Sequence, residues 1–461
     1  MTVLRRFMLF VVVASLLAPT TGAQAPAAAG GVPRPNVLII FTDDQRPDTM
    51  MVMPQTQKWF EQLGTEYPNT YAATPLCCPS RANIMTGRYA HNTGVVDNST
   101  HHSMDQSTTL QALLRQAGYK TAVVGKYFNG WPLRRKPQHF DRWAIFRSGY
   151  FNTKWGVDGK LRRIGRYSTD YIAAKASRLI RSFDKSKDSQ PWMMYVTPSA
   201  PHEPFTPVTR HANSAVPPWD PAPSVGEQDK SDKPQAVKNS GADREGVSRL
   251  REDQLRTLMA VDEMVGRIMK ELREQRELKR TLVFFFSDNG YFWGEHGLTD
   301  KRMPYTEAIE VPFYARWPGR IAKGVKDQRQ VSLVDVAPTI LAATGTPPHP
   351  TVPLDGRSLF DTWDREDIYT EYFPDKAAGA IGSWASIRTR AIQYAEYYAA
   401  DGITVDFREY YDLVEDPYQL ENLLEDDDPT NDPSPAEIQE LSLRLSSYRT
   451  CQGTSGANPC P

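Results

Sequence analysis

Four short apolar runs, rich in β-branched and aromatic residues, recur along the first two thirds of the chain. They cover residues 37–41, 120–124, 192–196 and 282–286. Continuous apolar runs of this length are typical of strands buried on both faces, as in a parallel sheet covered by helices. Before the last run, apolar residues recur every three or four positions over 247–277, which predicts a long amphipathic helix. The alternation of strand and helix favours an α/β fold with a large, mostly parallel sheet flanked by helices.

The pattern changes after residues 356–359. Short strand-like segments at 384–388, 392–398 and 409–413 predict a small antiparallel sheet, and a helix is expected near 436–448. We therefore divide the chain into a larger domain over 34–365, a C-terminal subdomain over 366–450 and a tail over 451–461.

The segment over 206–246 is rich in Pro, Ser, Asp and Lys and shows little periodicity. Long irregular stretches inside a domain are usually functional loops or disordered segments. Two interpretations stay open: the segment lies over or beside a ligand pocket, or it is a loose surface insertion.

The first 25 residues resemble a secretory signal. Arg5 and Arg6 precede an apolar run over 7–17, and small residues at 23 and 25 fit a cleavage site. The apolar run is much shorter than the ~20 residues that span a bilayer. An uncleaved anchor is the alternative. We expect an exported protein, secreted or periplasmic, without stable membrane insertion.

Charge and cysteine content narrow the class of protein further. The formal net charge is -1, without the basic excess typical of nucleic-acid-binding proteins. Of four cysteines, Cys451 and Cys460 lie close together near the C-terminus, and we expect a disulfide between them in an oxidising compartment. Cys77 and Cys78 are adjacent, and neighbouring residues seldom meet disulfide geometry, so this pair needs another explanation.

Polar residues follow each of the four apolar runs. In chain order they are Asp43 with Asp44, Lys126, His202, and Asp288 with Asn289. In open α/β sheets, ligands bind beyond the carboxyl ends of the strands. The oxygen-only acids and amide suit a hard cation such as Ca²⁺ or Mg²⁺, and they lack the His or Cys spacing of a zinc site. Each residue alone could cap a helix or form a turn, but their coincidence favours a metal site.

Residues 74–88, TPLCCPSRANIMTGR, contain the most specific motif of the chain. A proline is tolerated at the start of a helix, so Cys77 is expected at a helix N-terminus, where backbone N–H groups favour an anion. Arg81, about one turn later, can reach the same place. The pattern Cys-x-Pro-Ser-Arg, followed by Thr-Gly-Arg, resembles the motif of the sulfatase family. In that family the first cysteine is oxidised to Cα-formylglycine.

The resemblance extends from about residue 35 to 423, through segments 36–44, 125–127, 200–202, 287–290, 294–302 and 411–423. It implies an alkaline-phosphatase-like α/β fold with its catalytic domain over 34–365. It also implies maturation by a formylglycine-generating enzyme and one divalent cation, Ca²⁺ with Mg²⁺ as the alternative. The implied metal ligands are Asp43, Asp44, Cys77, Asp288 and Asn289. The implied catalytic residues are Cys77, Arg81, Lys126, His202 and Lys301.

One position departs from the family pattern. Many relatives have a histidine two residues after the first lysine, where it helps to release sulfate, and this chain has Phe128 followed by Asn129. The form Gly-Lys-Tyr-x-Asn resembles the N-acetylglucosamine-6-sulfatase branch more than the arylsulfatase branch. His296 could supply the missing imidazole or could simply pack.

The resemblance implies a sulfuric ester hydrolase that releases sulfate from a sulfated carbohydrate, such as 6-sulfated N-acetylglucosamine, or from an aryl sulfate. Cationic groups would hold the anionic ester, and one hydroxyl of hydrated formylglycine, deprotonated by Asp288, would attack sulfur. His202 or Lys301 would protonate the departing alcohol. Two alternatives remain: a phosphonate or phosphodiester hydrolase on the same fold, and a non-catalytic protein that binds sulfated glycans.

Overall fold

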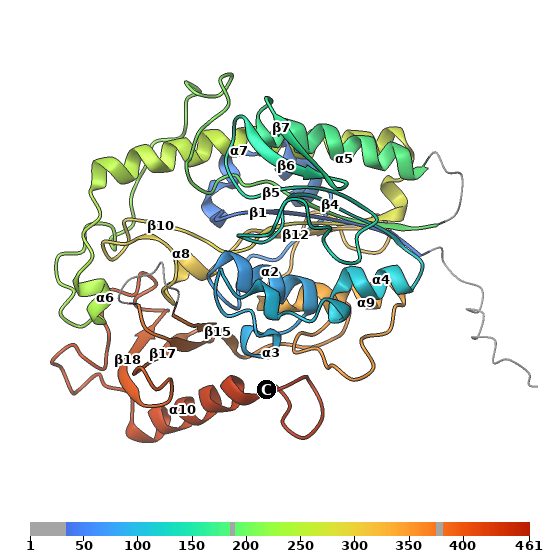
Figure 1. Cartoon of the computed structure of the whole chain (residues 1–461). Helices are drawn as coiled ribbons and strands as arrows, with labels where there is room; N and C mark the ends of the chain where they lie inside the picture. Colours follow the sequence, from blue (N-terminus) through green and yellow to red (C-terminus); the bar gives the residue numbers. More distant parts are fainter. Residues whose placement is uncertain (1–33, 185–189, 375–380) are drawn as a thin grey trace, which may run out of the picture. The chain divides into compact units, whose positions relative to one another are not determined.

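A ten-stranded mixed sheet lies at the centre of this computed structural model, which describes residues 34–184, 190–374 and 381–461 (Figure 1). Five neighbouring strands run parallel in the order β9 (Thr281–Ser287), β1 (Asn36–Thr42), β8 (Trp192–Thr197), β4 (Lys120–Lys126) and β5 (Arg142–Phe146). Four of the five are the strands predicted from the apolar runs, which confirms the predicted fold class. The signal predicted over 1–25 lies outside the described residues.

Further strands extend both edges of this sheet. One edge carries β6 (Thr153–Val157) and β7 (Lys160–Ile164), and the other carries β12 (Phe313–Arg316), β2 (Thr65–Glu66) and β13 (Val325–Lys326). They join the sheet through antiparallel pairs, except that β13 pairs parallel with β2. The apolar-run criterion missed these strands and β5. The two outermost strands, β7 and β13, are mostly exposed and contain charged residues, because edge strands have less surface to bury.

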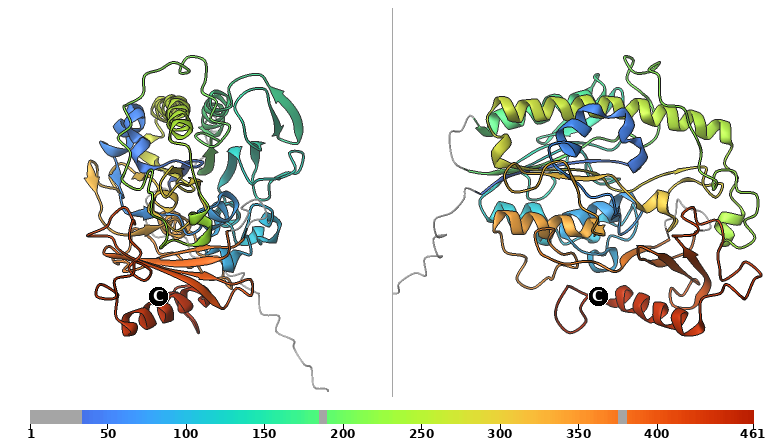
Figure 2. Two further views of the ribbon diagram at one scale, coloured as in Figure 1. Left: turned by 90° about the vertical axis from the view of Figure 1, so that its left-hand side faces the viewer. Right: turned by 180° about the vertical axis from the view of Figure 1, so that it is seen from behind.

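Helices cover both faces of the sheet (Figures 1 and 2). α5 (Ser168–Asp184) and α7 (Arg244–Glu274) pack on the face that carries Leu38 and Ile40 of β1. α2 (Cys77–Thr86), α4 (Leu110–Gln116) and α9 (Val336–Thr344) pack on the opposite face, which carries Val37 and Ile39. Since successive strand residues point to opposite faces, both faces of β1 are buried, as its continuous apolar run predicts.

The C-terminal part forms a separate antiparallel sheet of four strands with one helix against it. The strands are β15 (Ile368–Tyr372), β16 (Trp384–Arg388), β17 (Ile392–Tyr398) and β18 (Val405–Asp412). α10 (Pro435–Thr450) buries Leu441 and Leu445 against this sheet. The predicted sheet and helix are confirmed, and so is the disulfide between Cys451 and Cys460.

Shorter elements connect these layers. They are η1 (Pro47–Val52), α1 (Pro54–Thr56), η2 (Gln57–Glu61), β3 (Thr70–Tyr71), α3 (Ala90–Thr93), η3 (His101–Ser103), η4 (Gln106–Thr108), α6 (Gln235–Lys238), η5 (Leu278–Arg280), β10 (Phe292–Trp293), β11 (Thr299–Asp300), α8 (Thr306–Ile309), β14 (Val331–Ser332) and η6 (Leu333–Asp335). In the described parts of the chain we find no helix with the length and apolar character needed to span a membrane.

The irregular segment over 206–246 is held by specific contacts. The His296 backbone N–H donates to the Ser224 carbonyl at 2.8 Å. Lys233 is fully buried and donates to the Leu420 carbonyl at 2.6 Å. These bonds attach the segment to the stretch that leads to Lys301 and to the C-terminal subdomain, so the structure favours a built loop over a loose surface insertion.

Candidate active site at the carboxyl ends of the central strands

The carboxyl ends of the central strands bring the predicted polar residues together. Lys126, at the end of β4, forms an ion pair with Asp43, which directly follows β1. Lys301 forms the matching ion pair with Asp44. His202, beyond the end of β8, places its Nε2 atom 3.8 Å from an Asp44 carboxylate oxygen. All of these side chains except the partly buried His202 are buried, so their charges are compensated inside one closed cluster.

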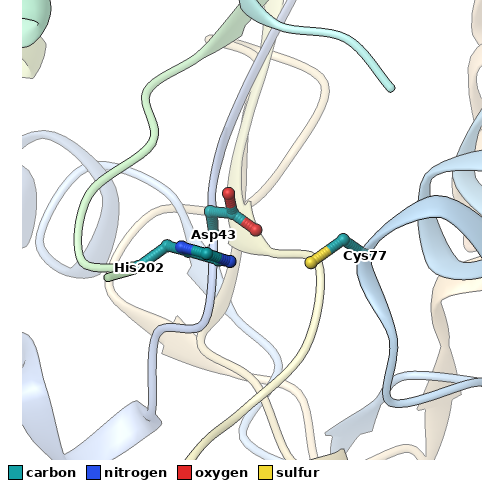
Figure 3. A group of neighbouring side chains, drawn as sticks. All are labelled: Asp43, Cys77 and His202. Carbon is teal, nitrogen blue, oxygen red and sulfur yellow. The ribbon is translucent and has the colours of Figure 1, made fainter. Parts of the chain in front are cut away.

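Cys77 lies at the centre of this cluster. It is the first residue of α2, after Leu76 in an extended conformation with φ -154°. Figure 3 shows its side chain directed toward Asp43 and His202, and potential ligand atoms of the three lie within 4.8 Å of one another. Lys126 and Lys301 place their Nζ atoms 3.6 and 3.5 Å from the Cys77 sulfur. The cluster thus surrounds residue 77 with cations and acids together.

The Cys77 thiol is unsuited to act as a nucleophile in its unmodified form. Burial raises its pKa well above the ordinary range, and the lowering effect of Lys126 and Lys301 does not offset it. The thiolate is the nucleophilic form of cysteine, so this shift makes the unmodified thiol a poorer nucleophile.

Arg81 connects the acids of two strands. Its Nε atom donates to Asp288 at 2.9 Å, and its Nη2 atom lies 2.8 Å from the same carboxylate oxygen and 3.4 Å from Asp43. Its Nη1 atom donates to the Lys126 carbonyl at 2.8 Å. Because the guanidinium presents donors in a rigid fork, one side chain fixes the relative positions of three predicted site residues.

The acidic residues fit a divalent cation. Carboxylate oxygens of Asp43, Asp44 and Asp288 lie within 4.8 Å of one another. Asp43 Oδ1 and Asn289 Oδ1 are buried and accept no hydrogen bond from any of the described residues. Burial and the neighbouring Asp43 carboxylate raise the pKa of Asp288 to about 7, which measures how unfavourable its charge is without further compensation. Converging carboxylates with unsatisfied oxygens are the ligand set that a hard cation prefers.

Two backbone features let the strands end so close together. Gly125 in β4 has φ +131°, and a Cβ atom there would lie 2.0 Å from the Thr197 carbonyl oxygen of β8. Asp44 adopts the left-handed region with φ +69°, which is uncommon for a non-glycine residue. Such strain concentrates at functional sites, where the surrounding contacts hold it in place.

Two positioning residues carry no sequence motif and were not predicted. Tyr150 donates its hydroxyl to the His202 carbonyl at 2.6 Å, and Thr197 donates to the Lys126 carbonyl at 2.7 Å. Both act on backbone atoms of site residues, so no spacing rule in the sequence could have identified them.

The surroundings of His296 and Phe128 bear on whether His296 could replace the histidine that is missing at position 128. His296 is fully buried, its Nδ1 atom pairs with Glu227 at 2.7 Å, and its ring lies 4.3 Å from that of Tyr305. The packing interpretation of His296 is therefore favoured. Phe128 lies in an aromatic cluster with Tyr127 and is stacked on His101, with ring centroids 5.8 Å apart.

Comparison with known families and curated proteins gives consistent matches. The family model described as Sulfatase matches residues 35–346, and the model described as N-sulphoglucosamine sulphohydrolase, C-terminal, matches residues 294–445. The chain is 29% identical to N-acetylglucosamine-6-sulfatase of Capra hircus, over 94% of this chain and 86% of the relative. It is 30% identical to an arylsulfatase of Volvox carteri, over 95% of this chain and 78% of the relative.

Solved structures agree with these matches. A protein in complex with its substrate D-glucosamine-2-N,6-O-disulfate superposes with a TM-score of 0.78 and 26% identity, over 90% of this chain and 97% of that protein. Phosphonate monoester hydrolase of Agrobacterium radiobacter superposes with a TM-score of 0.70 and 21% identity, over 90% and 96% of the two chains. At that identity the second match shows a shared fold alone.

Proposed function

The chain belongs to the sulfatase family, and from this we propose that it releases inorganic sulfate from a 6-sulfated glucosamine through a formylglycine at residue 77. Family membership makes it a sulfuric ester hydrolase, as its motifs predicted. The observation that carries the finer proposal is the convergence of Cys77, Arg81, Lys126 and Lys301 on one acidic cluster.

Relatives support the choice of sugar. Curated N-acetylglucosamine-6-sulfatases match over most of this chain, including the Bacteroides thetaiotaomicron enzyme at 28% identity over 85% of the chain. The structural neighbour at 26% identity has a 6-sulfated glucosamine as its substrate. The Gly-Lys-Tyr-x-Asn form at 125–129 points to the same branch.

Residue 77 would act as a hydrated aldehyde. Oxidised to formylglycine and hydrated, it presents two hydroxyls close to where the Cys77 sulfur lies. One hydroxyl loses its proton to Asp288 and attacks sulfur, and the bond from sulfur to the sugar oxygen breaks. The second hydroxyl then loses its proton to whichever of His202 or Lys301 protonated the sugar oxygen, while the C–O bond to sulfate breaks, which frees sulfate and restores the aldehyde. These two reaction steps need hydroxyl groups at residue 77, which is why the thiol of the unmodified chain would have to be oxidised.

The surrounding cations would stabilise the anionic ester and its transition state. Lys126 and Lys301 flank residue 77, and Arg81 holds Asp43 and Asp288 in place. Asp43, Asp44, Asp288 and Asn289, together with modified residue 77, would hold a divalent cation, which would supply further positive charge to the site. Preorganised charges in a buried site cost no reorganisation when the reaction occurs.

His202 and Lys301 are the candidates for protonating the departing sugar oxygen. His202 Nδ1 donates to the Glu203 carbonyl at 3.0 Å, so Nε2 is directed at the cluster and would donate a proton from the imidazolium form of the ring. Lys301 Nζ lies 3.5 Å from the residue 77 sulfur. Both groups therefore reach the side of residue 77 where the ester would bind.

A paired experiment tests this function. Mass spectrometry of the peptide around residue 77 should show formylglycine or its hydrate in protein produced together with a formylglycine-generating enzyme. The same protein should release sulfate from glucosamine 6-sulfate faster than from aryl sulfates, phosphonate esters or phosphodiesters. Full activity of unmodified Cys77 protein contradicts the mechanism, and faster turnover of phosphonates would favour the phosphonate hydrolase alternative.

We further propose that the cation is Ca²⁺, with Mg²⁺ as the alternative. Elemental analysis of the purified enzyme should find calcium, and Asn289→Ala should lower its content. Removal with a chelator should reduce turnover by roughly 10²-fold or more, since a metal contributes several kcal/mol to charge stabilisation. Restoration by Mg²⁺ but not Ca²⁺ would reverse the choice of ion, and full activity without any divalent ion would contradict the site.

Export is part of the same proposal. The signal-like residues 1–25 and the expected disulfide, now observed, support an oxidising destination. N-terminal sequencing of the mature protein should begin near residue 26. A chain that keeps its first residues and stays in the cytoplasm would contradict export.

A further inference from the structure

A groove of about 690 Å³ is lined by residues of the β6–β7 hairpin and of α5. Figure 1 shows these elements side by side at the edge of the large sheet. None of the proposed catalytic or metal-binding residues lines the groove. Its cationic lining residues are Lys160, Arg162, Arg163, Arg166, Lys175 and Arg178. Among the described lining residues Asp158 is the one carboxylate, so the groove concentrates positive charge.

This charge is largely uncompensated. Asp158 is already paired with Arg142 at 3.1 Å and with Lys175 at 3.6 Å. Within the described ranges, Lys160, Arg162, Arg166 and Arg178 form no ion pair with a carboxylate, and residues 160–166 contain no acid at all. The whole chain has a net charge of -1, so the excess does not follow from a basic composition.

Uncompensated like charges around a concave surface repel one another and attract an anion. Four of the six cations are arginines, whose planar guanidinium forms paired hydrogen bonds with sulfate and carboxylate groups. Tyr171 and Ile164 add apolar surface to the same groove. Its volume lies within the range of ligand sites, roughly 300–1,000 Å³. These features fit an anionic oligomer that has apolar faces between its charges.

The groove is connected to the candidate active site by strand register. Lys126 of β4 pairs with Phe146 of β5, Phe146 with Trp155 of β6, and Trp155 with Arg162 of β7. Three steps between neighbouring strands correspond to about 14 Å along the sheet. The groove therefore lies within reach of a chain that has one sugar at residue 77.

Two tyrosines join the end of the groove to the His202 segment. Tyr167, the residue after Arg166, donates to the Thr206 carbonyl at 3.0 Å and stacks on Tyr150 at 5.5 Å. Tyr150 in turn donates to the His202 carbonyl. The groove is thus rigidly placed relative to the catalytic cluster.

We propose that this groove binds a sulfated glycan chain at sugars outside the one being hydrolysed. The inference rests on the proposed function, because that function supplies a sulfated sugar as the ligand. A concave lining favours a narrow linear polyanion over a flat anionic membrane. The groove would hold the polymer while the terminal sugar occupies the active site, and so would favour long substrates over single sugars.

The test combines one variant with a matched control. Arg162→Ala/Arg166→Ala/Arg178→Ala removes three exposed cations from the groove. Arg267→Ala/Lys279→Ala/Lys323→Ala removes three exposed cations elsewhere on the described surface. Binding of heparin fragments of increasing length is measured for both and for the unaltered enzyme, together with kcat/KM on glucosamine 6-sulfate.

The groove variant should bind long heparin fragments roughly tenfold more weakly, as expected for the loss of three exposed ion pairs. Its kcat/KM on the single sugar should equal that of the unaltered enzyme, and the control variant should match the unaltered enzyme in both measurements. Equal binding of long fragments by both variants would overturn the proposal. So would tighter binding of a DNA duplex or of phosphatidylserine vesicles through the same three arginines.

Failure of the groove and failure of the proposed function give different results. If the unaltered enzyme binds heparin through the groove but releases no sulfate from any sugar, the result supports the groove proposal and contradicts the proposed function. If it hydrolyses the single sugar but the groove variant binds heparin normally, the function stands and the groove proposal fails.

Discussion

Cys77 and Cys78 are neighbours in the chain, yet their side chains enter different surroundings. The Cys77 sulfur lies between the Nζ atoms of Lys126 and Lys301. The Cys78 sulfur accepts from the Asn129 backbone N–H at 3.2 Å and belongs to the apolar core under α2. A single step along the helix therefore separates a proposed catalytic position from a structural one.

We predict opposite effects on turnover for the alanine variants of these two cysteines. Cys77→Ala should abolish turnover because the gem-diol cannot form, while the protein stays folded. Cys78→Ala should keep most turnover and lose about 1 kcal/mol of stability, since it leaves only a small cavity. Sulfate release and urea unfolding measure both effects. Loss of turnover in a well-folded Cys78→Ala protein would show that Cys78 also takes part in the reaction.

The short helix α3 contacts two segments that are distant from it in the chain, β15 and the residues around Cys451. His91 on this short helix pairs its Nδ1 atom with Glu371 of β15 at 2.9 Å, and its Nε2 atom donates to the Cys451 carbonyl at 3.1 Å. Burial alone would lower the pKa of His91, but the Glu371 carboxylate outweighs burial and raises the pKa from 6.5 to about 9.

This shift predicts a pH-dependent stability. Because the folded pKa lies above the ordinary value, the ion pair stabilises the fold fully below pH 6.5, and its contribution is lost as pH rises through about 9. His91→Gln should therefore lower the free energy of unfolding by up to about 3 kcal/mol below pH 6.5, with a difference that shrinks between pH 6.5 and about 9 and is absent above. Urea unfolding against pH measures it. His102→Gln, at an exposed position, is the control, and a constant His91→Gln difference across pH would contradict the ion pair.

In the described part of the chain from residue 34 onward, the C-terminal sheet contacts the segment that carries Lys301. Trp384 donates to the Arg302 carbonyl at 2.8 Å, and Gln393 donates to the Pro304 carbonyl at 2.6 Å. Tyr305 donates to the buried carboxylate of Glu409 at 2.6 Å. The C-terminal sheet thus holds the backbone on which a proposed catalytic lysine is placed.

Glu409 is the centre of this attachment, because Tyr397 and Tyr411 also donate to it, at 2.5 and 2.8 Å. Glu409→Leu should destabilise the fold by about 3 kcal/mol or more, since it leaves three buried hydroxyls without an acceptor. Glu409→Gln, which keeps an acceptor oxygen, should cost clearly less, and Glu415→Leu at an exposed site should cost almost nothing. Thermal and urea unfolding compare the three variants. Equal losses for the leucine and glutamine variants at 409 would contradict the role of the tyrosine hydroxyls.

The sequence by itself determined four central strands, the long helix α7, the helix start at Cys77 and the residues at the strand ends. A strand that is buried on both faces has a continuous run of apolar residues. A helix start depends on residues that are adjacent in the chain. Both features can therefore be recognised from the order of the residues alone. The sequence also indicated the family, because the motif around Cys77 is specific.

Only the tertiary structure decided which of these residues meet. Lys301 follows none of the predicted strands and reaches Asp44 because the C-terminal sheet holds its backbone. His296 resembled a site residue but is buried against Tyr305 and Glu227. The edge strands and the basic groove on β7 depend on partners far away in the chain. Periodicity records whether a residue is buried, but contact between distant residues is set by the packing of the whole fold.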